Sequence, residues 1–237
     1  MPTPVDQINK KDYEVNYGGN VVWSSMFLNE TGGECNVSVR PEIIKLLHEG
    51  KMGSWCYGPT LNQAVWDAIQ KYKQGKVCAD IGCGNNSPYP SFLVASGYSA
   101  VVTYDVRFPK KWDSQIVPKR ADLADDSLML RPELDLAISI SCIEHVGLGR
   151  YGDKLDPDGD IKMTQNIRKL LKPGGILIFA IPIGRAEVVW NAHRCYNEYR
   201  LGKLLEGFEK IDELGELRMK KHSNHVTQPV VVARKIS

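Results

Sequence analysis

The feature that most constrains this chain is an alternation of short apolar runs with helix-like segments from Lys76 onward. We predict strands at Val77–Ile81, Ala100–Val106, Leu134–Ile140, Ile176–Ile181 and Val226–Ala233, and helices at Tyr89–Gly97, Asp160–Leu171 and Asn197–Glu206. Strands that alternate with helices favour a parallel sheet with helices on both faces. The sequence therefore predicts a Rossmann-like, doubly wound α/β domain, and ligands of such sheets bind beyond the carboxyl ends of the strands.

The segment before Lys76 has a different character. Residues 1 to about 38 are rich in Gly, Asn and Ser around the apolar run Val21–Leu28, which indicates an irregular arm. Two helices follow, at Pro41–Glu49 and Leu61–Lys73, the first with proline in its first turn. We therefore divide the chain into residues 1–75, an N-terminal helical extension that forms a lid or cap, and residues 76–237, the main domain.

Composition excludes several function classes. Thirty Lys and Arg against twenty-eight Asp and Glu give a net charge of +2, without the strongly basic balance typical of nucleic-acid binding. Apolar runs stay far shorter than a membrane span, and residues 1–11 lack the apolar core of a signal peptide. Six cysteines without a close pair indicate reduced thiols. We expect a cytoplasmic protein without a membrane span or a nucleic-acid partner.

A glycine loop ends the first predicted strand, in the segment Asp80-Ile81-Gly82-Cys83-Gly84-Asn85-Asn86-Ser87. Glycines let such a turn close tightly and bring backbone amides to a ligand. Ser87 stands where the dinucleotide pattern requires its third glycine. Asp80 would repel a pyrophosphate, whereas it would attract the ammonium and sulfonium of S-adenosylmethionine. The loop therefore favours S-adenosylmethionine over a dinucleotide.

Two further acids follow the loop at suitable distances. Asp105 closes the next strand, where a carboxylate accepts both ribose hydroxyls. Asp122 precedes the fourth strand and is a candidate acceptor for the adenine amino group, with a cap or a solvated loop residue as the equal alternative. The predicted cofactor site comprises Asp80, Gly82, Gly84, Asn85, Asp105, Asp122, Leu123 and Ser141.

These motifs resemble those of the class I S-adenosylmethionine-dependent methyltransferases over about residues 76 to 235. Asp80-Ile81-Gly82-Cys83-Gly84 resembles their first motif, and Lys172-Pro173-Gly174-Gly175 resembles the turn before their fifth strand. The resemblance implies seven strands in the order 3-2-1-4-5-7-6, the last antiparallel. More narrowly, residues 143–153 and 191–194 resemble a subgroup known only as a domain of unknown function, which implies no substrate.

His145 is the best-placed candidate base, because it follows the fourth strand, where the transferred methyl group is expected. A hydroxyl acceptor must lose its proton, and a neutral imidazole near its ordinary pKa of about 6.5 suits that task. Packing beside the cofactor is the alternative role. Glu144 and His193 complete the predicted catalytic set.

Metal dependence is a separate question. Glu144-His145 resembles the segment that binds a divalent metal in the quinone-biosynthesis O-methyltransferases, which makes both residues candidate ligands of an ion such as Mg²⁺. Ser141 replaces a further acid of those enzymes, which argues against the metal. In the acidic loop nearby, we expect Asp158 or Asp160 to cap the following helix.

The acceptor is the least constrained part. Trp190, Arg194 and Tyr196 surround His193 after the fifth strand, in a stretch that borders the acceptor pocket in related methyltransferases; loop packing is the alternative. Tryptophan and histidine suit a sugar ring, so we favour O-methylation of a sugar or glycan hydroxyl with His145 as general base. Two alternatives stay open: methylation of a phenolic or carboxylate small molecule, and a non-catalytic cofactor-binding partner or sensor. The basic run Arg218, Lys220, Lys221 and His222 indicates a solvated turn or a phosphate contact.

Overall fold

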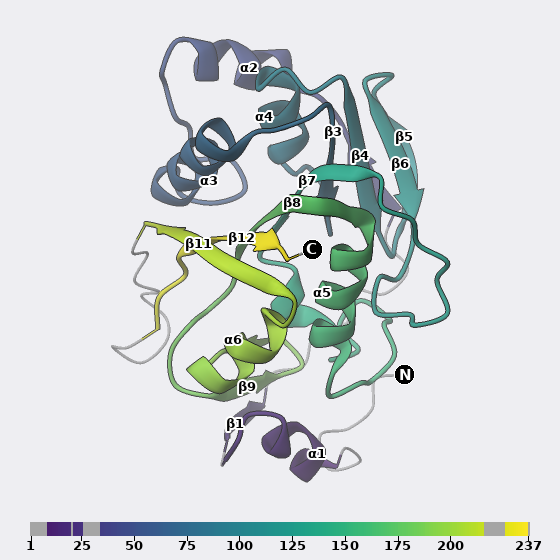
Figure 1. Ribbon diagram of the computed structural model, residues 1–237, viewed down its shortest axis with the longest axis vertical. Coiled ribbons are helices and arrows are strands. Elements are labelled where there is room, and N and C mark those ends of the chain that lie inside the picture. Colours follow the sequence, from purple (N-terminus) through teal and green to yellow (C-terminus); the bar gives the residue numbers. More distant parts are fainter. Residues whose placement is uncertain (1–8, 20, 26–33, 216–225, 237) are drawn as a thin grey trace.

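A seven-stranded sheet forms the centre of the computed structural model, which describes residues 9–19, 21–25, 34–215 and 226–236 (Figure 1). The strand order is β11-β12-β8-β7-β3-β4-β6. The strands are β3 (Val77–Ile81), β4 (Ala100–Asp105), β6 (Ile116–Arg120), β7 (Leu134–Ile140), β8 (Leu171–Ala180), β11 (Phe208–Leu214) and β12 (Val230–Lys235). The strand β12 runs antiparallel to both neighbours, and the others are parallel to each other. The predicted order 3-2-1-4-5-7-6 with an antiparallel last strand is confirmed.

Helices cover both faces of the sheet (Figure 1). One face packs against α2 (Pro41–His48), α3 (Pro59–Tyr72) and α4 (Tyr89–Ala95), and the other against α5 (Gly159–Leu170) and α6 (Glu198–Leu204). Successive residues of a strand point to opposite faces, so Ile178 joins the first core while Leu177 and Phe179 join the second. Burial on both faces explains why the central strands are continuous apolar runs.

The helices before Lys76 complete this core. Ile43 of α2 and Val65 and Ile69 of α3 are fully buried in the same cluster as Ile178 and Val232 of the sheet. The boundary predicted at residue 75 therefore does not separate two cores. The lid or cap role of residues 1–75 stays a prediction.

The N-terminal arm contributes regular structure of its own. After α1 (Lys10–Val15), β1 (Val22–Ser25) pairs with β9 (Glu187–Trp190), which also pairs with β10 (His193–Cys195). The strand β2 (Glu34–Val37) pairs with β5 (Phe108–Trp112). Of the apolar run predicted at Val21–Leu28, residues 21–25 are described. The run from Arg218 to His222 lies outside the described residues.

Two local predictions need correction. The strand β8 begins at Leu171 rather than at the predicted Ile176. Leu134 pairs with Leu171 and Leu136 pairs with Ile176, so residues 172–175 form a bulge inside the strand. Asp158 occupies the N-cap position of α5 without a side-chain capping bond. Asp160 is fully buried and pairs with Arg200. Leaving a buried guanidinium without a carboxylate would cost more free energy than leaving the helix end without a side-chain cap. Across the described ranges, the helices are too short or too polar to cross a membrane.

Candidate active site

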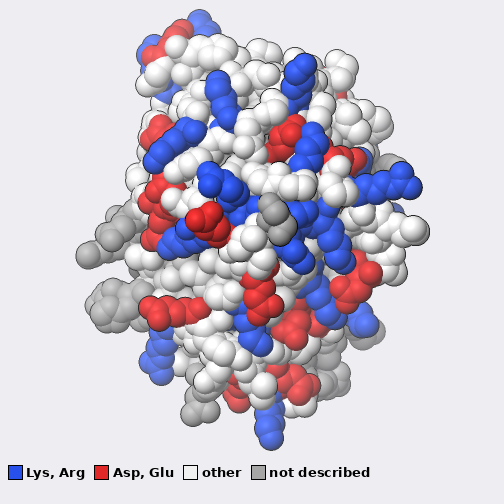
Figure 2. All heavy atoms as spheres, in the orientation of Figure 1, with Lys and Arg blue, Asp and Glu red and all other residues white. Residues whose placement is uncertain are grey.

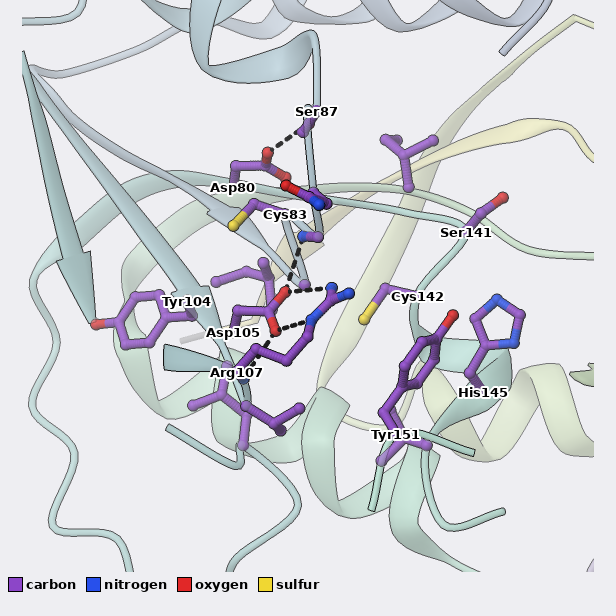
Figure 3. Close-up of a pocket in the computed structure, with 18 of the residues that line it drawn as sticks. Asp80, Cys83, Ser87, Tyr104, Asp105, Arg107, Ser141, Cys142, His145 and Tyr151 are labelled. Atoms are coloured by element: carbon purple, nitrogen blue, oxygen red, sulfur yellow. Dashed lines mark hydrogen bonds and ion pairs between the residues drawn. The ribbon is translucent and has the colours of Figure 1, made fainter. Parts of the chain in front are cut away.

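A cavity of about 360 Å³ opens at the carboxyl ends of β3, β4 and β7 (Figure 3). It is lined by all eight predicted cofactor residues, Asp80, Gly82, Gly84, Asn85, Asp105, Asp122, Leu123 and Ser141, and by His145. The glycine loop needs glycine here: Gly82 has φ +69°, and a Cβ atom on it would lie 2.0 Å from the sulfur of Cys142. The fold thus brings the predicted cofactor residues to one site.

Asp80 is the most deeply buried acid of the cavity wall, at 2% exposure. Its carboxylate accepts a hydrogen bond from Ser87 Oγ at 2.9 Å, so the serine that breaks the dinucleotide pattern supports the acid. Burial, with a smaller contribution from Asp105, raises the pKa of Asp80 to about 7. A ligand with a positive charge near Asp80 would favour its ionised form.

Asp105, at the end of the neighbouring strand β4, is held by four donors. It accepts from the backbone N–H groups of Gly84, at 2.8 Å, and Arg107, at 2.9 Å. The Arg107 side chain adds Nε at 2.8 Å and Nη2 at 3.0 Å. Sequence reasoning missed Arg107, because only the turn after β4 brings its guanidinium back over the carboxylate (Figure 3).

Three further cofactor candidates are held by hydrogen bonds, one local and two to distant segments of the chain. Asp122 accepts from the N–H of Ala124 at 2.9 Å, and Asn85 Oδ1 accepts from the N–H of Asn36 in β2 at 2.9 Å. Ser141 has a positive φ of +50°, and its hydroxyl accepts from Gln228. Asn85 therefore links the glycine loop to the N-terminal arm.

His145 and Glu144 end the short 3-10 helix Ile143–His145 that follows β7. His145 Nδ1 donates to the carbonyl of Ala192, which leaves Nε2 as an acceptor, 3.9 Å from Glu144 Oε1. Burial lowers the pKa of His145 to about 3, well below the 6.5 expected from the sequence. Burial raises the pKa of Glu144 to about 8, and among the described residues its Oε2 has no hydrogen-bond partner.

Sequence comparison identifies the family. The model for "Caenorhabditis protein of unknown function, DUF268" matches residues 98–232. The chain belongs to this family. The match spans β4 to β12, including Asp105, the Glu144–His145 pair and most of the cavity rim. No curated protein matches the sequence.

Solved structures show which fold the DUF268 chain shares. A 1,6-didemethyltoxoflavin-N1-methyltransferase from Burkholderia thailandensis, crystallised with S-adenosylhomocysteine, is 20% identical, with a TM-score of 0.58 over 83% of this chain and 86% of the other. An S-adenosylmethionine-dependent methyltransferase from Methanosarcina mazei is 19% identical, with a TM-score of 0.53 over 71% and 97%. The 4+2 cyclase SpnF is 15% identical, with a TM-score of 0.53 over 87% and 99%. The fold is that of the class I methyltransferases.

The predicted acceptor residues of this DUF268 member lie elsewhere. Trp190, Arg194 and Tyr196 are at most 1% exposed and do not line the cavity. Arg194 donates to the carbonyls of Val146 and Asp156, at 3.2 Å for the latter, and Tyr196 donates to Asp160 at 2.8 Å. Arg194 thus holds the loop after the 3-10 helix, and Tyr196 contacts the first turn of α5. His193 lies on β10, outside the cavity lining, and its proximity helps to lower the pKa of His145.

Aromatic side chains also contribute to the cavity lining. Tyr57 and Tyr151 both line it. Tyr151 lies edge-on to His145, with ring centroids 5.9 Å apart, and Tyr57 stacks on Tyr89 at 6.3 Å. The Gly-Arg-Tyr-Gly stretch around Tyr151 was the available signal, because such glycines allow an exposed turn.

The donor set for a divalent ion does not assemble. Within residues 9–19, 21–25, 34–215 and 226–236, no group of three or more His, Cys, Asp or Glu side chains is arranged to hold a metal. Beside Glu144 and His145, the place of a third metal ligand is taken by the Ser141 hydroxyl, which accepts a hydrogen bond from Gln228. The residues present do not fit the predicted magnesium site.

Proposed function

We propose that this chain is an S-adenosylmethionine-dependent methyltransferase. The observation that carries the proposal is the pair of buried carboxylates, Asp80 and Asp105, on either side of the glycine loop at the sheet's ligand-binding edge. Two buried acids suit a ligand with an ammonium and a sulfonium and disfavour a pyrophosphate. Asp105 would hold the ribose, and Asp122 and Leu123 would border the adenine. When bound, this cofactor supplies an electrophilic methyl group.

The proton acceptor follows from the tautomer of His145. Its Nε2 carries no proton, and His145 lines the cavity, so we propose Nε2 as the atom that accepts the proton of a hydroxyl. Alone, an imidazole with a pKa of about 3 is a weak base. Ionised Glu144, with its Oε1 3.9 Å from Nε2, would stabilise the imidazolium that forms. We therefore propose His145 as the general base, with Glu144 as the residue that makes it basic enough.

For the acceptor, we keep the hydroxyl of a sugar or glycan as the favoured class. Tyr57, Tyr151 and His145 line one region of the cavity, and flat rings suit the apolar faces of sugars. On the face in Figure 2, acidic side chains are interspersed among the basic ones, which disfavours a nucleic-acid acceptor. All six cysteines are free, which supports a reducing compartment such as the cytoplasm.

The fold alone does not require methyl transfer, as the similarity to the cyclase SpnF illustrates. Turnover of radiolabelled S-adenosylmethionine against sugars, nucleotide sugars, phenols and carboxylates is the direct test. We expect labelled product with a sugar hydroxyl and loss of turnover in His145→Ala, with cofactor binding retained. A product with phenols or carboxylates alone would favour the second acceptor class. Cofactor binding without turnover on any acceptor would favour a sensor or partner subunit.

A further inference from the structure

The Arg107 side chain makes the contacts to Asp105 that a bound ribose would make. The two oxygens of a carboxylate offer about four lone-pair sites. In Asp105 these sites face four donors: the N–H of Gly84, the N–H of Arg107, and Arg107 Nε and Nη2. The carboxylate is therefore saturated. Two ribose hydroxyls find no free lone pair until the guanidinium leaves.

The surroundings of the guanidinium place it inside the cavity. A Cβ atom on Gly84 would lie 3.1 Å from Arg107 Nη2, so the guanidinium rests against the glycine loop. Its Cζ lies 5.3 Å from the ring of Tyr151, on the opposite rim. Figure 3 shows Arg107 reaching across the cavity between Asp105 and Tyr151. The same space lies between the ribose acid and the proposed base.

The ion pair between Arg107 and Asp105 is shielded from solvent, which makes it stronger than an exposed pair. The side chains of Arg107 and Asp105 are 18% and 6% exposed, and the contact uses both carboxylate oxygens. Partly buried, bidentate arginine–carboxylate pairs are stronger than surface pairs, which contribute little. Arg107 also supplies a positive charge beside the buried acid Asp105.

We propose that Arg107 competes with the ribose of the cofactor for Asp105 and thereby sets the cofactor affinity of this chain. The inference rests on the proposed function, because it assumes a nucleoside ligand at Asp105. In the ligand-free protein Arg107 neutralises the site. On binding, the ribose hydroxyls replace Arg107 Nε and Nη2, while the backbone donors of Gly84 and Arg107 stay in place. The guanidinium then has the face of Tyr151 as its nearest partner.

The test is calorimetric binding of S-adenosylhomocysteine to the wild type and to Arg107→Met, which keeps the aliphatic stem and removes the competing charge. We expect the variant to bind about tenfold more tightly, because binding no longer breaks a charged hydrogen-bonded pair. The ligand-free variant should also melt at a lower temperature, since Asp105 loses its counter-ion. The matched control is Arg131→Met, which removes the same charge from an exposed position outside the cavity lining. Its affinity should equal that of the wild type.

Arg107→Lys keeps the test decisive if the methionine variant does not fold. Lysine retains the charge but lacks the bidentate fork, so affinity should rise less than in Arg107→Met. Unchanged or weaker binding in the folded Arg107 variants, with the wild type binding normally, would overturn the competition and leave the proposed function intact. No binding in any variant, including the wild type, would overturn the proposed function and the inference with it.

Discussion

Glu144 and His145 are neighbours in sequence whose side chains meet at 3.9 Å, Oε1 to Nε2, while burial moves their pKa values in opposite directions, to about 8 and about 3. Burial penalises the charged form of each group. Near neutral pH the pair is therefore mainly uncharged. If methyl transfer needs ionised Glu144 to support His145, the reaction responds to pH through the carboxyl group.

We predict that kcat rises with pH and levels off above about pH 8, as Glu144 loses its proton. Glu144→Gln should have low activity that does not change across this range, because the amide cannot ionise. Measurement of kcat from pH 6 to pH 9.5 at saturating substrates decides this. A wild-type profile that is flat or falls through pH 8 would mean that Glu144 does not support the base.

The same shift predicts a stability effect. The folded pKa of Glu144 is raised above its ordinary value of 4.5, so the carboxyl contributes stability that is fully present below about pH 4.5. This stability is lost as the pH rises toward 8. The Tm of Glu144→Gln minus the Tm of the wild type should therefore be larger at pH 9 than at pH 5, by about 2 °C or more. A Tm difference that is constant with pH would argue against the raised pKa.

Arg194 should act on stability rather than on acceptor binding. Its buried guanidinium ties β10 to the carbonyls of Val146 and Asp156, so Arg194→Met should cost about 3–5 kcal/mol in the free energy of unfolding. Denaturant unfolding measures this loss. Arg185→Met, at an exposed position, is the control and should stay within about 0.5 kcal/mol of the wild type. If Arg194→Met folded normally and raised the KM for the acceptor, the sequence-based assignment to the acceptor pocket would be restored.

Metal removal provides another test. The donor set around Glu144 and His145 lacks a third ligand within the described chain. We therefore expect turnover to be unchanged after exhaustive chelation, and unchanged again when magnesium or manganese is restored. Activity that disappears in chelator and returns with one ion would show that a metal acidifies the acceptor.

The sequence predicted the centre of the fold well because buried parallel strands leave a strong signal. The bounds of β3 and β7 match the predicted runs residue for residue. The edge strands β6 and β11 were missed, since each is partly exposed and charged residues interrupt its apolar pattern, as at Lys119 and Glu209. For the same reason, a regular arm of β1 and β2 was not foreseen.

Some residues of the candidate site could likewise be predicted from the sequence, and others could not. Asp80, Asp105 and the glycine loop were predictable, because strand ends place them together in any sheet of this kind. Arg107 was not, since its role depends on a turn that returns its side chain over Asp105. Arg194 and Tyr196 were assigned to an acceptor pocket from their place in sequence. Their burial with Asp160 became evident only from tertiary contacts.

The central claim is that the cavity binds S-adenosylmethionine through Asp105, and calorimetry tests it most directly. The wild type should bind S-adenosylmethionine and S-adenosylhomocysteine, and should bind both more tightly than NAD. Asp105→Ala should weaken the binding of both by roughly 1.5–3 kcal/mol, the usual contribution of charged hydrogen bonds. Tighter binding of NAD, or S-adenosylmethionine binding that does not change in Asp105→Ala, would contradict the account.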